Sequence, residues 1–277
     1  MFGKYLVCGK WFFDTETRAE GLIDMNNLGK RFRHGFVGKR YAAQIRGNLS
    51  QGPRNLVAIG SKRGSQEQPL LLNAVADPTG QRIAFVDLQY QLYYEEEFFN
   101  RSDTILTHVT KGLPSDNFQY AYPDWLYGEE VFETDTAMWW SPDGMKLAFA
   151  AFNETNTNSI NITLFEANES FNVKYPKAGE LNQKNVPIIS VYVHGVETKE
   201  TRLIPKPSYI AEDAILSFAK WITDDVLLLS YLDRPQLTHQ NKQAANEPIA
   251  IPKENKFLII LPQEDEIGFR AIASLDL

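Results

Sequence analysis

Two acidic runs in the sequence place adjacent carboxylates between aromatic residues, and either run could bind a cation. One is DWLYGEEVF, residues 124–132, and the other is YYEEEFF, residues 93–99. An ammonium group that leaves water loses its hydration, so a site for it must supply opposite charge at close range. Two neighbouring carboxylates also repel each other, and a bound cation relieves that repulsion. Both runs are therefore candidate cation sites.

The backbone at Glu129 and Glu130 decides whether both side chains can reach one ligand. Successive side chains on a strand point to opposite faces, so two adjacent glutamates of an extended chain diverge. We therefore predict a short helical turn or bulge at residues 127–131. The alternative is that the acidic pair is simply solvated, as most glutamates are. The residues of this pair alone leave both interpretations open.

The elements that must position these carboxylates are β-strands. Alternation with period two and an excess of β-branched and aromatic residues dominate the sequence, and no stretch shows a sustained helical period. The clearest strand patterns are NLVAIG, RIAFVDLQYQLYY, MKLAFAAF, IISVYVHGV and DVLLLSYL. The predicted fold class is all-β.

A repeated turn and strand divides the chain into similar units. ADPTGQRIAFVD begins at Ala76 and SPDGMKLAFAAF begins at Ser141, and a weaker copy, KWITDDVLLLSYL, begins at Lys220. In the first two, proline follows a short polar residue and glycine comes two residues later, which suits a type I turn that opens a hairpin. Pro78 and Pro142 are 64 positions apart, which is long for one four-stranded unit but fits a β-propeller blade with a large inserted loop. We predict a partial β-propeller of several four-stranded blades.

Composition limits the partners of this chain. Its 277 residues, of which 43% are apolar, are enough to bury a large core as one domain or two. The formal net charge of -7 argues against a nucleic acid or an anionic membrane surface as the main partner. The basic stretch KRFRHGFVGKR, residues 30–40, is a local exception that we interpret as a solvated strand and turn.

Glycosylation signals point to a secreted or lumenal protein. The single Cys8 cannot form an internal disulfide. Acceptor tripeptides begin at five asparagines, three of them crowded into one segment: Asn48, Asn100, Asn153, Asn161 and Asn168. No apolar run is long enough for a signal core or for a membrane span of about 20 residues. We therefore expect that further sequence precedes residue 1.

The segment DWLYGEEVFETDTAMWWSPDGMKLAFAAFNET, residues 124–155, resembles the propeller domain of the dipeptidyl peptidase IV family of serine exopeptidases. The family pattern there is D-W-x-Y-E-E-E, a short spacer, W-W-S-P-[DN]-G, a strand and F-N-[DE]-T. Weaker similarity is carried by FRHGFVGKRYAAQI at residues 32–45, YPKAG at 175–179 and LDRPQ at 232–236. The resemblance runs, with gaps, over residues 3–236 and implies blades of an eight-bladed propeller.

The resemblance implies roles for three residues. In the family, the second and third carboxylates of the triplet bind the free N-terminal ammonium of a substrate peptide, and they fall on Glu129 and Glu130. Arg33 falls on the arginine that hydrogen-bonds a backbone carbonyl of the substrate, a role that suits the fixed donors of a guanidinium. Gly128 replaces the first glutamate of the triplet. The same resemblance makes YYEEEFF the end of a blade strand and its exposed loop.

The catalytic machinery of the family is not found in this sequence. Family members carry their serine, acid and histidine on a separate α/β-hydrolase domain after the propeller. This chain has no G-x-S-x-G motif, and we interpret its four histidines as surface or packing residues: His34, His108, His194 and His239. Metal-site spacings, a phosphate loop and a dinucleotide turn are absent. We expect no catalytic residue, cofactor or metal here, and no peptide hydrolysis by this chain alone.

We accordingly predict that residues 1–277 form a dipeptidyl peptidase IV-like propeller that is incomplete at both ends, with a divergent tail at residues 237–277. The implied function is recognition of the free amine of peptides in an exopeptidase that releases X-Pro or X-Ala dipeptides. The implied partners are those peptides, the hydrolase domain and a second copy in a homodimer, and not nucleic acid. The implied location is secreted or the extracellular side of the plasma membrane, as a type II membrane glycoprotein.

Two other classes of function stay open at this point. The chain could come from a non-catalytic family member that acts as a binding or channel-associated subunit. It could also be a short product that serves only as an interaction module, which requires the partial propeller to fold by itself.

Overall fold

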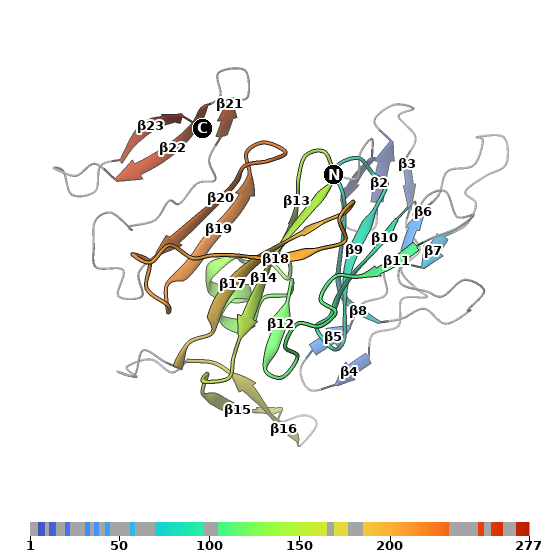
Figure 1. The fold of residues 1–277 in the computed structure, drawn as a ribbon. Helices are drawn as coiled ribbons and strands as arrows, with labels where there is room; N and C mark the ends of the chain where they lie inside the picture. The colour runs from blue at the N-terminus through green and yellow to red at the C-terminus, as the bar shows by residue number, and fades with distance from the viewer. Residues whose placement is uncertain are drawn as a thin grey trace. The chain divides into compact units, whose positions relative to one another are not determined.

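The computed structural model describes residues 70–96, 105–164, 169–176 and 185–232, and the backbone of further strands within residues 5–58 and 249–276. These residues form antiparallel sheets, which confirms the all-β prediction (Figure 1). The chain divides into two compact units, one of residues 1–113 with 120–122 and the other of residues 114–119 with 123–277. Within the described part of the chain, no helix is long and apolar enough to cross a bilayer.

The first unit contains a four-stranded antiparallel sheet of the kind that forms a propeller blade. Its strands lie in the order β11-β10-β9-β8, so each strand pairs with its neighbour in the sequence. They are β8 (Leu71–Ala76), β9 (Ile83–Asp87), β10 (Leu92–Glu96) and β11 (Ile105–His108). The strands nearer the N-terminus form smaller sheets: β1 (Tyr5–Cys8), β2 (Trp11–Asp14) and β3 (Glu20–Leu22), then β4 (Arg31–Arg33) with β5 (Phe36–Gly38), and β6 (Ala42–Gln44) with β7 (Leu56–Ala58).

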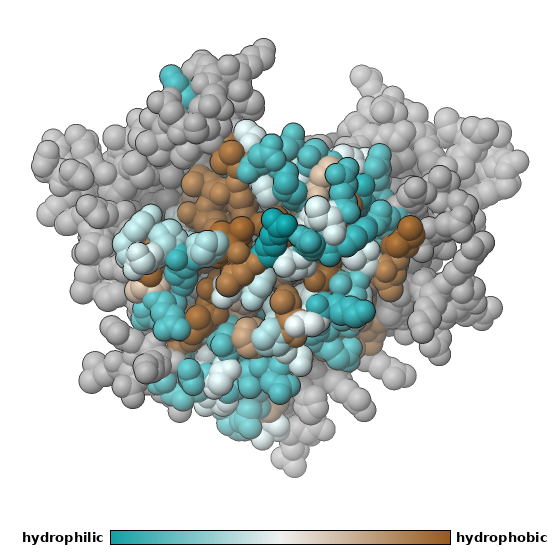
Figure 2. All heavy atoms as spheres, in the orientation of Figure 1, coloured by the Kyte–Doolittle hydropathy of each residue, from teal (hydrophilic) through white to brown (hydrophobic). Residues whose placement is uncertain are grey.

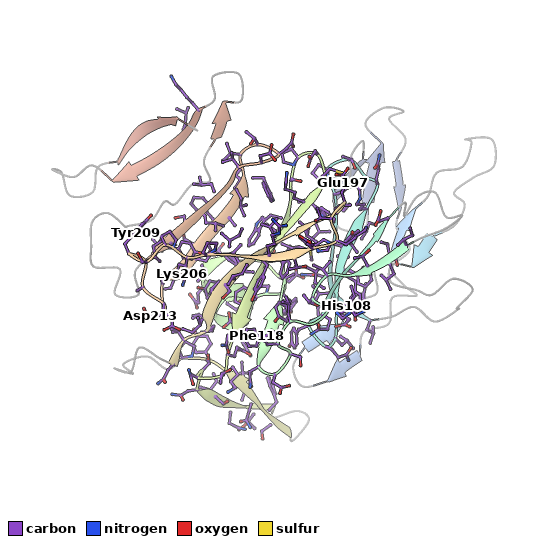
Figure 3. All side chains as sticks on the ribbon, in the orientation of Figure 1. His108, Phe118, Glu197, Lys206, Tyr209 and Asp213 are labelled. Atoms are coloured by element: carbon purple, nitrogen blue, oxygen red, sulfur yellow. The ribbon has the colours of Figure 1, made fainter. Side chains whose placement is uncertain are left out.

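A row of stacked rings crosses the four-stranded sheet. The ring of Tyr93 stacks on Phe85 at a centroid distance of 5.7 Å and on His108, labelled in Figure 3, at 4.4 Å. Burial lowers the pKa of His108 below the usual range of histidine. His108 is therefore a packing residue, as predicted, and His194 is buried in the second unit. His34 and His239 lie outside the described residues.

The second unit is built around β14, whose residues from Leu147 to Phe152 are all buried. The sheet has the order β12-β14-β17-β18, with β13 also paired to β14. Its strands are β12 (Phe118–Tyr120), β13 (Met138–Trp140), β14 (Lys146–Asn153), β17 (Ile188–Gly195) and β18 (Thr201–Ile204). The described part of this unit also holds smaller sheets: β15 (Ser159–Leu164) with β16 (Glu169–Lys174), β19 (Ile215–Trp221) with β20 (Leu227–Leu232), and β21 (Ile249–Ile251) with β22 (Lys256–Pro262) and β23 (Arg270–Asp276).

The repeated turns have the predicted form. Gly80 donates its backbone N–H to the carbonyl of Asp77 at 3.0 Å, and Gly144 donates to Ser141 at 2.9 Å. Both glycines have a positive φ, 73° and 70°, which other residues rarely adopt. The two turns differ in which position carries the hydroxyl donor and which the carboxylate acceptor. In the first turn, the hydroxyl of the third residue, Thr79, donates to the first residue, Asp77; in the second turn, the hydroxyl of the first residue, Ser141, donates to the third, Asp143. The weaker third copy forms the turn between β19 and β20.

The second and third copies of the turn contact each other within the second unit. The backbone N–H of Asp143 donates to the carboxylate of Asp224 at 2.9 Å, and the ammonium of Lys146 pairs with Asp225 at 2.7 Å. Deeper in the unit, the indole N–H of Trp221 donates to the carbonyl of Trp139 at 2.9 Å. The repeats thus hold neighbouring sheets together as well as turning the chain.

We expect Asp77→Ala to destabilise the first unit by about 3 kcal/mol, because this carboxylate is buried and charge-paired. Its oxygens accept the backbone N–H of Gln81 at 2.8 Å and the guanidinium N–H of Arg82 at 3.2 Å. Thr79→Ala is the matched control, since it removes one hydroxyl donor to the same carboxylate and should cost about 1 kcal/mol. Denaturant unfolding measures both variants, and equal losses would contradict this account of the turn.

The loop between β18 and β19 is held by Lys206, which Figure 3 labels together with Tyr209 and Asp213. The Lys206 ammonium donates to the carbonyl of Glu212 at 2.8 Å and lies 5.3 Å from the ring centre of Tyr231. Figure 2 shows apolar side chains gathered over β19 and β20, and all six residues of β20 are half-buried.

Candidate functional site

A helical turn forms at the predicted residues. It is the π-helix η2 (Tyr127–Val131), drawn as the green coil in Figure 1. The N–H of Gly128 donates to the carbonyl of Asp124 at 2.8 Å, and the N–H of Phe132 donates to the carbonyl of Tyr127 at 2.7 Å. The second bond spans five residues, which is the wide spacing of a π-helix. Such single turns occur frequently at functional sites.

On a helical turn, Glu129 and Glu130 diverge less than they would on a strand. Adjacent side chains on a helix are separated by about 100° around the axis, compared with about 180° on a strand. Both glutamates are exposed. Neither carboxylate has a hydrogen bond or an ion pair with another residue of the described part of the chain. Two adjacent carboxylates are thus open to a ligand from solvent.

Aromatic packing holds the opposite side of η2 against the sheet. The buried ring of Tyr127 makes edge contacts with Phe132 at 5.3 Å and with Phe152 of β14 at 5.0 Å, measured between ring centres. Phe132 in turn contacts the ring of Trp139 of β13 at 6.0 Å. These rings remove the apolar face of the turn from water and leave its acidic face outside.

A hydrogen bond ties η2 to a distant strand. The backbone N–H of Leu216 in β19 donates to the phenolic oxygen of Tyr127 at 3.2 Å. Burial raises the pKa of Tyr127 well above its usual range, so the hydroxyl stays protonated. A neutral hydroxyl can accept this bond while keeping its own proton to donate.

The two ends of η2 are defined by acidic residues. At the start, the carboxylate of Asp124 accepts the N–H of Tyr127 at 3.2 Å, as a helix-capping side chain does. Asp124 is only 1% exposed, and burial, followed by the charge of Glu154, raises its pKa to about 7. At the other end, Glu133 has a φ of 52°, and this left-handed conformation ends the helix.

Gly128 occupies the position of the first glutamate of the family triplet without a steric reason. A Cβ built on it would meet the side chain of Pro123 and the carbonyl of Thr134 at 3.7 Å each, which is ordinary contact. Its φ lies outside the left-handed range. The site therefore has room for a side chain at this position.

The other acidic run, YYEEEFF, begins in a strand of the four-stranded sheet. Its residues up to Glu96 belong to β10, as the interpretation of a strand end requires. Glu95 is 5% exposed, so it is a buried strand residue and not part of an exposed loop. Residues 97–99 lie outside the described part of the chain. The described carboxylates of this run, Glu95 and Glu96, are buried and half-buried, whereas Glu129 and Glu130 are exposed.

The third predicted binding residue, Arg33, is the last residue of β4, where it pairs with Phe36. Its side chain lies outside the described residues, and it belongs to the first unit whereas the glutamates belong to the second. The role of Arg33 stays a prediction.

Two of the five glycosylation candidates are described. Asn153 ends β14, and its amide oxygen accepts both the N–H and the hydroxyl of Thr155, at 3.0 and 2.6 Å. Asn161 is exposed on β15 and donates to the amide oxygen of Asn172 at 3.1 Å. The other candidates lie outside the described residues: Asn48, Asn100 and Asn168. Glycosylation stays a prediction at all five.

In the described part of the chain, no cluster of three or more His, Cys, Asp or Glu could hold a metal ion.

Comparison with known families identifies the chain. A sequence model of the dipeptidyl peptidase IV (DPP IV) N-terminal region matches residues 19–248, which include η2. The chain belongs to this family. The match ends before β21, and the assignment of residues 237–277 as a divergent tail stays a prediction.

Family members with curated names match a part of this chain. Prolyl endopeptidase FAP of Bos taurus is 31% identical over 166 residues, which cover 57% of this chain and 21% of that protein. Venom dipeptidyl peptidase 4 of Apis mellifera is 33% identical over 173 residues, with the same shares of 57% and 21%. The chain thus spans about a fifth of the length of these relatives.

The fold is that of the family. The crystal structure of dipeptidyl peptidase 4 from Porphyromonas gingivalis matches with a TM-score of 0.54 and 20% identity, over 85% of this chain and 29% of that one. Together with the blade-like sheets, this confirms the all-β partial propeller.

Sequence reasoning missed the residues that support the glutamates. Asp124 and Tyr127 were part of the motif, but the sequence analysis assigned them no role. The helical segment begins at residue 125, directly after Asp124, and an aspartate in that position is a capping signal. The predicted turn began two residues later, so this signal was not used. The bond between Tyr127 and Leu216 joins residues 89 positions apart, and no local pattern indicates it.

Proposed function

We propose that this chain is the amine-recognition part of a dipeptidyl peptidase IV-like serine exopeptidase. The observation that carries this proposal is the presentation of Glu129 and Glu130 on one turn. Both are exposed and have no partner in the described part of the chain, and buried aromatic rings hold the turn from below. A surface acidic pair with no function needs no such support.

The two carboxylates replace the hydration of a substrate ammonium with opposite charge. Charge-assisted hydrogen bonds of this kind are among the strong ones, and two acceptors side by side can share the three protons of an ammonium group. Holding the N-terminus also fixes the distance to the scissile bond. By holding the N-terminus in one place, the glutamates position the bond after the second residue at the nucleophile of a hydrolase domain in the full-length protein.

The proposal extends to partners and location. The substrates are peptides with a free N-terminus and proline or alanine in second place, and Arg33 hydrogen-bonds a backbone carbonyl of the bound peptide. A homodimer, a secreted or extracellular membrane location and sugars on the asparagine candidates belong to the same proposal. The names of the relatives, a venom dipeptidyl peptidase 4 and a prolyl endopeptidase, support the peptidase assignment.

The test compares a free and a blocked N-terminus. We expect the intact protein to release an X-Pro dipeptide from a peptide with a free amine, and acetylation of that amine to lower kcat/KM about 100-fold or more, because it removes the charge that both glutamates hold. Mass spectrometry of the products measures both rates. Equal cleavage of the two peptides would overturn the amine-recognition role. Binding of the free peptide without cleavage would keep that role and remove the enzymatic one.

A further inference from the structure

The start of η2 is held by the buried carboxyl of Asp124, whereas Glu129 and Glu130 on the same turn are exposed. We propose that Asp124 is a positioning residue of the amine site, which holds the first turn of η2 and whose charge state changes how tightly Glu129 and Glu130 bind an ammonium. This inference rests on the proposed function.

Asp124 engages the helix through both its side chain and its main chain. Its Oδ1 accepts the N–H of Tyr127 at 3.2 Å, and its backbone carbonyl accepts the N–H of Gly128 at 2.8 Å. The second bond leads directly into Glu129 and Glu130. A shift of Asp124 therefore moves the backbone that carries both carboxylates.

The other oxygen of the Asp124 carboxyl, Oδ2, is also buried. Asp124 Oδ2 has no hydrogen-bond partner among the described residues. The charge of a second buried carboxyl, Glu154, acts on it, and Glu154 itself accepts the amide N–H of Gln119 at 2.7 Å. A buried carboxylate with a free oxygen and a like charge nearby binds a proton more readily than one in water. Burial and Glu154 together raise the pKa of Asp124 to about 7, so it exchanges its proton near neutral pH.

The charged and titratable groups around Asp124 come from several elements. Tyr127 on η2 contacts it, and Tyr231 of β20 in turn acts on Tyr127. Lys174 of β16 acts on Glu154, whose own pKa burial raises. The exposed pair of glutamates follows on the next turn of η2. Asp124 thus lies among groups that are mostly acidic, and Lys174 favours the charged form of Glu154.

Ionisation of Asp124 should strengthen the amine site. Five residues at a rise of no more than about 1.5 Å each put Asp124 within about 7.5 Å of Glu129 along the helix axis, near enough for its charge to attract a bound ammonium. A carboxylate is also a stronger acceptor than a carboxylic acid for the N–H of Tyr127. By reciprocity, a bound ammonium favours the ionised form of Asp124. The amine affinity should therefore rise with pH while Asp124 loses its proton.

The experiment is calorimetric binding of the dipeptide glycyl-proline to the intact protein at about pH 6 and about pH 7.5, below the point near pH 8 at which the ligand amine loses its proton. We expect the affinity to rise about threefold or more over this range in the wild type and to stay flat in Asp124→Asn. Glu154→Gln removes a like charge, so it should move the midpoint of the rise to lower pH. A merely structural role of Asp124 would not produce that shift.

Asp124→Asn keeps the acceptor oxygen for Tyr127, so it tests the charge even if Asp124→Ala fails to fold. The same pH dependence in Asp124→Asn and the wild type would overturn the inference. Glu129→Gln separates this failure from that of the proposed function. If Glu129→Gln abolishes binding while Asp124→Asn changes nothing, the inference alone falls. If the wild type does not bind the dipeptide, or binds it as Glu129→Gln does, both fall.

Discussion

Glu129→Gln and Glu130→Gln should each lower kcat/KM for release of an X-Pro dipeptide by about 100-fold or more in the intact protein. Each substitution keeps the shape of the side chain and removes one of the two charges that meet the substrate ammonium. Because the partner amine then loses hydration without full compensation, the loss exceeds that of a surface ion pair. Steady-state kinetics with a free-amine peptide measures the effect.

The control for this prediction is Glu133→Gln. Glu133 is also an exposed glutamate close to η2, but it follows the end of the helix and has a left-handed backbone. Its neutralisation should change kcat/KM less than about twofold, because an exposed charge that does not contact the ligand is screened by water and salt. If either helix variant kept most of the wild-type activity, or if Glu133→Gln lost as much, the assignment of the amine site would be wrong.

The double variant should lose less than the product of the single losses, since the two carboxylates serve one ligand.

Tyr127→Ala should destabilise the second unit by about 4–6 kcal/mol, the largest effect on stability that we expect. The substitution removes a ring that is buried against Phe132 and Phe152. It also leaves the backbone N–H of Leu216 without its acceptor in a buried strand. Chemical denaturation followed by far-ultraviolet circular dichroism measures the loss of free energy of unfolding.

Tyr127→Phe separates the two contributions. This variant keeps the ring and removes only the phenolic oxygen, so it should cost about 1–3 kcal/mol from the buried N–H that loses its partner. Amine binding should weaken in Tyr127→Ala even below its unfolding temperature, because the rings that support η2 are reduced. A loss in Tyr127→Phe equal to that in Tyr127→Ala would show that ring packing contributes little.

The strands and turns of this chain were predictable because their signals are local. Proline and glycine at fixed spacing specify the turns at Asp77 and Ser141, and alternation specifies the strands that follow. The helical turn at residues 127–131 was predicted from a chemical requirement, since two adjacent side chains can share a ligand only off an extended backbone. These features depend on residues a few positions apart.

The burial of individual acidic residues could not be predicted from composition. Glu95 stands in an acidic run that suggests an exposed loop, and the sheet of the first unit buries it. Asp124 is buried beside Glu154, although both are acids that usually remain in water. Which charged residues become buried depends on how the strands pack against one another. The residues next to them in the sequence do not indicate this.

The sequence by itself determined the strands and the repeated turns, because short-range sterics and hydrophobic alternation specify them. The helical turn at the acidic pair followed from the requirement that two adjacent side chains share one ligand. Only the tertiary structure decided what supports that turn. The hydrogen bond from Leu216 to Tyr127, the rings of Phe132 and Phe152 beneath it and the carboxyl of Asp124 at its start all depend on β14 and β19 packing around η2. Contacts of this kind form between residues far apart in the chain, so their energies are set by packing and not by local pattern.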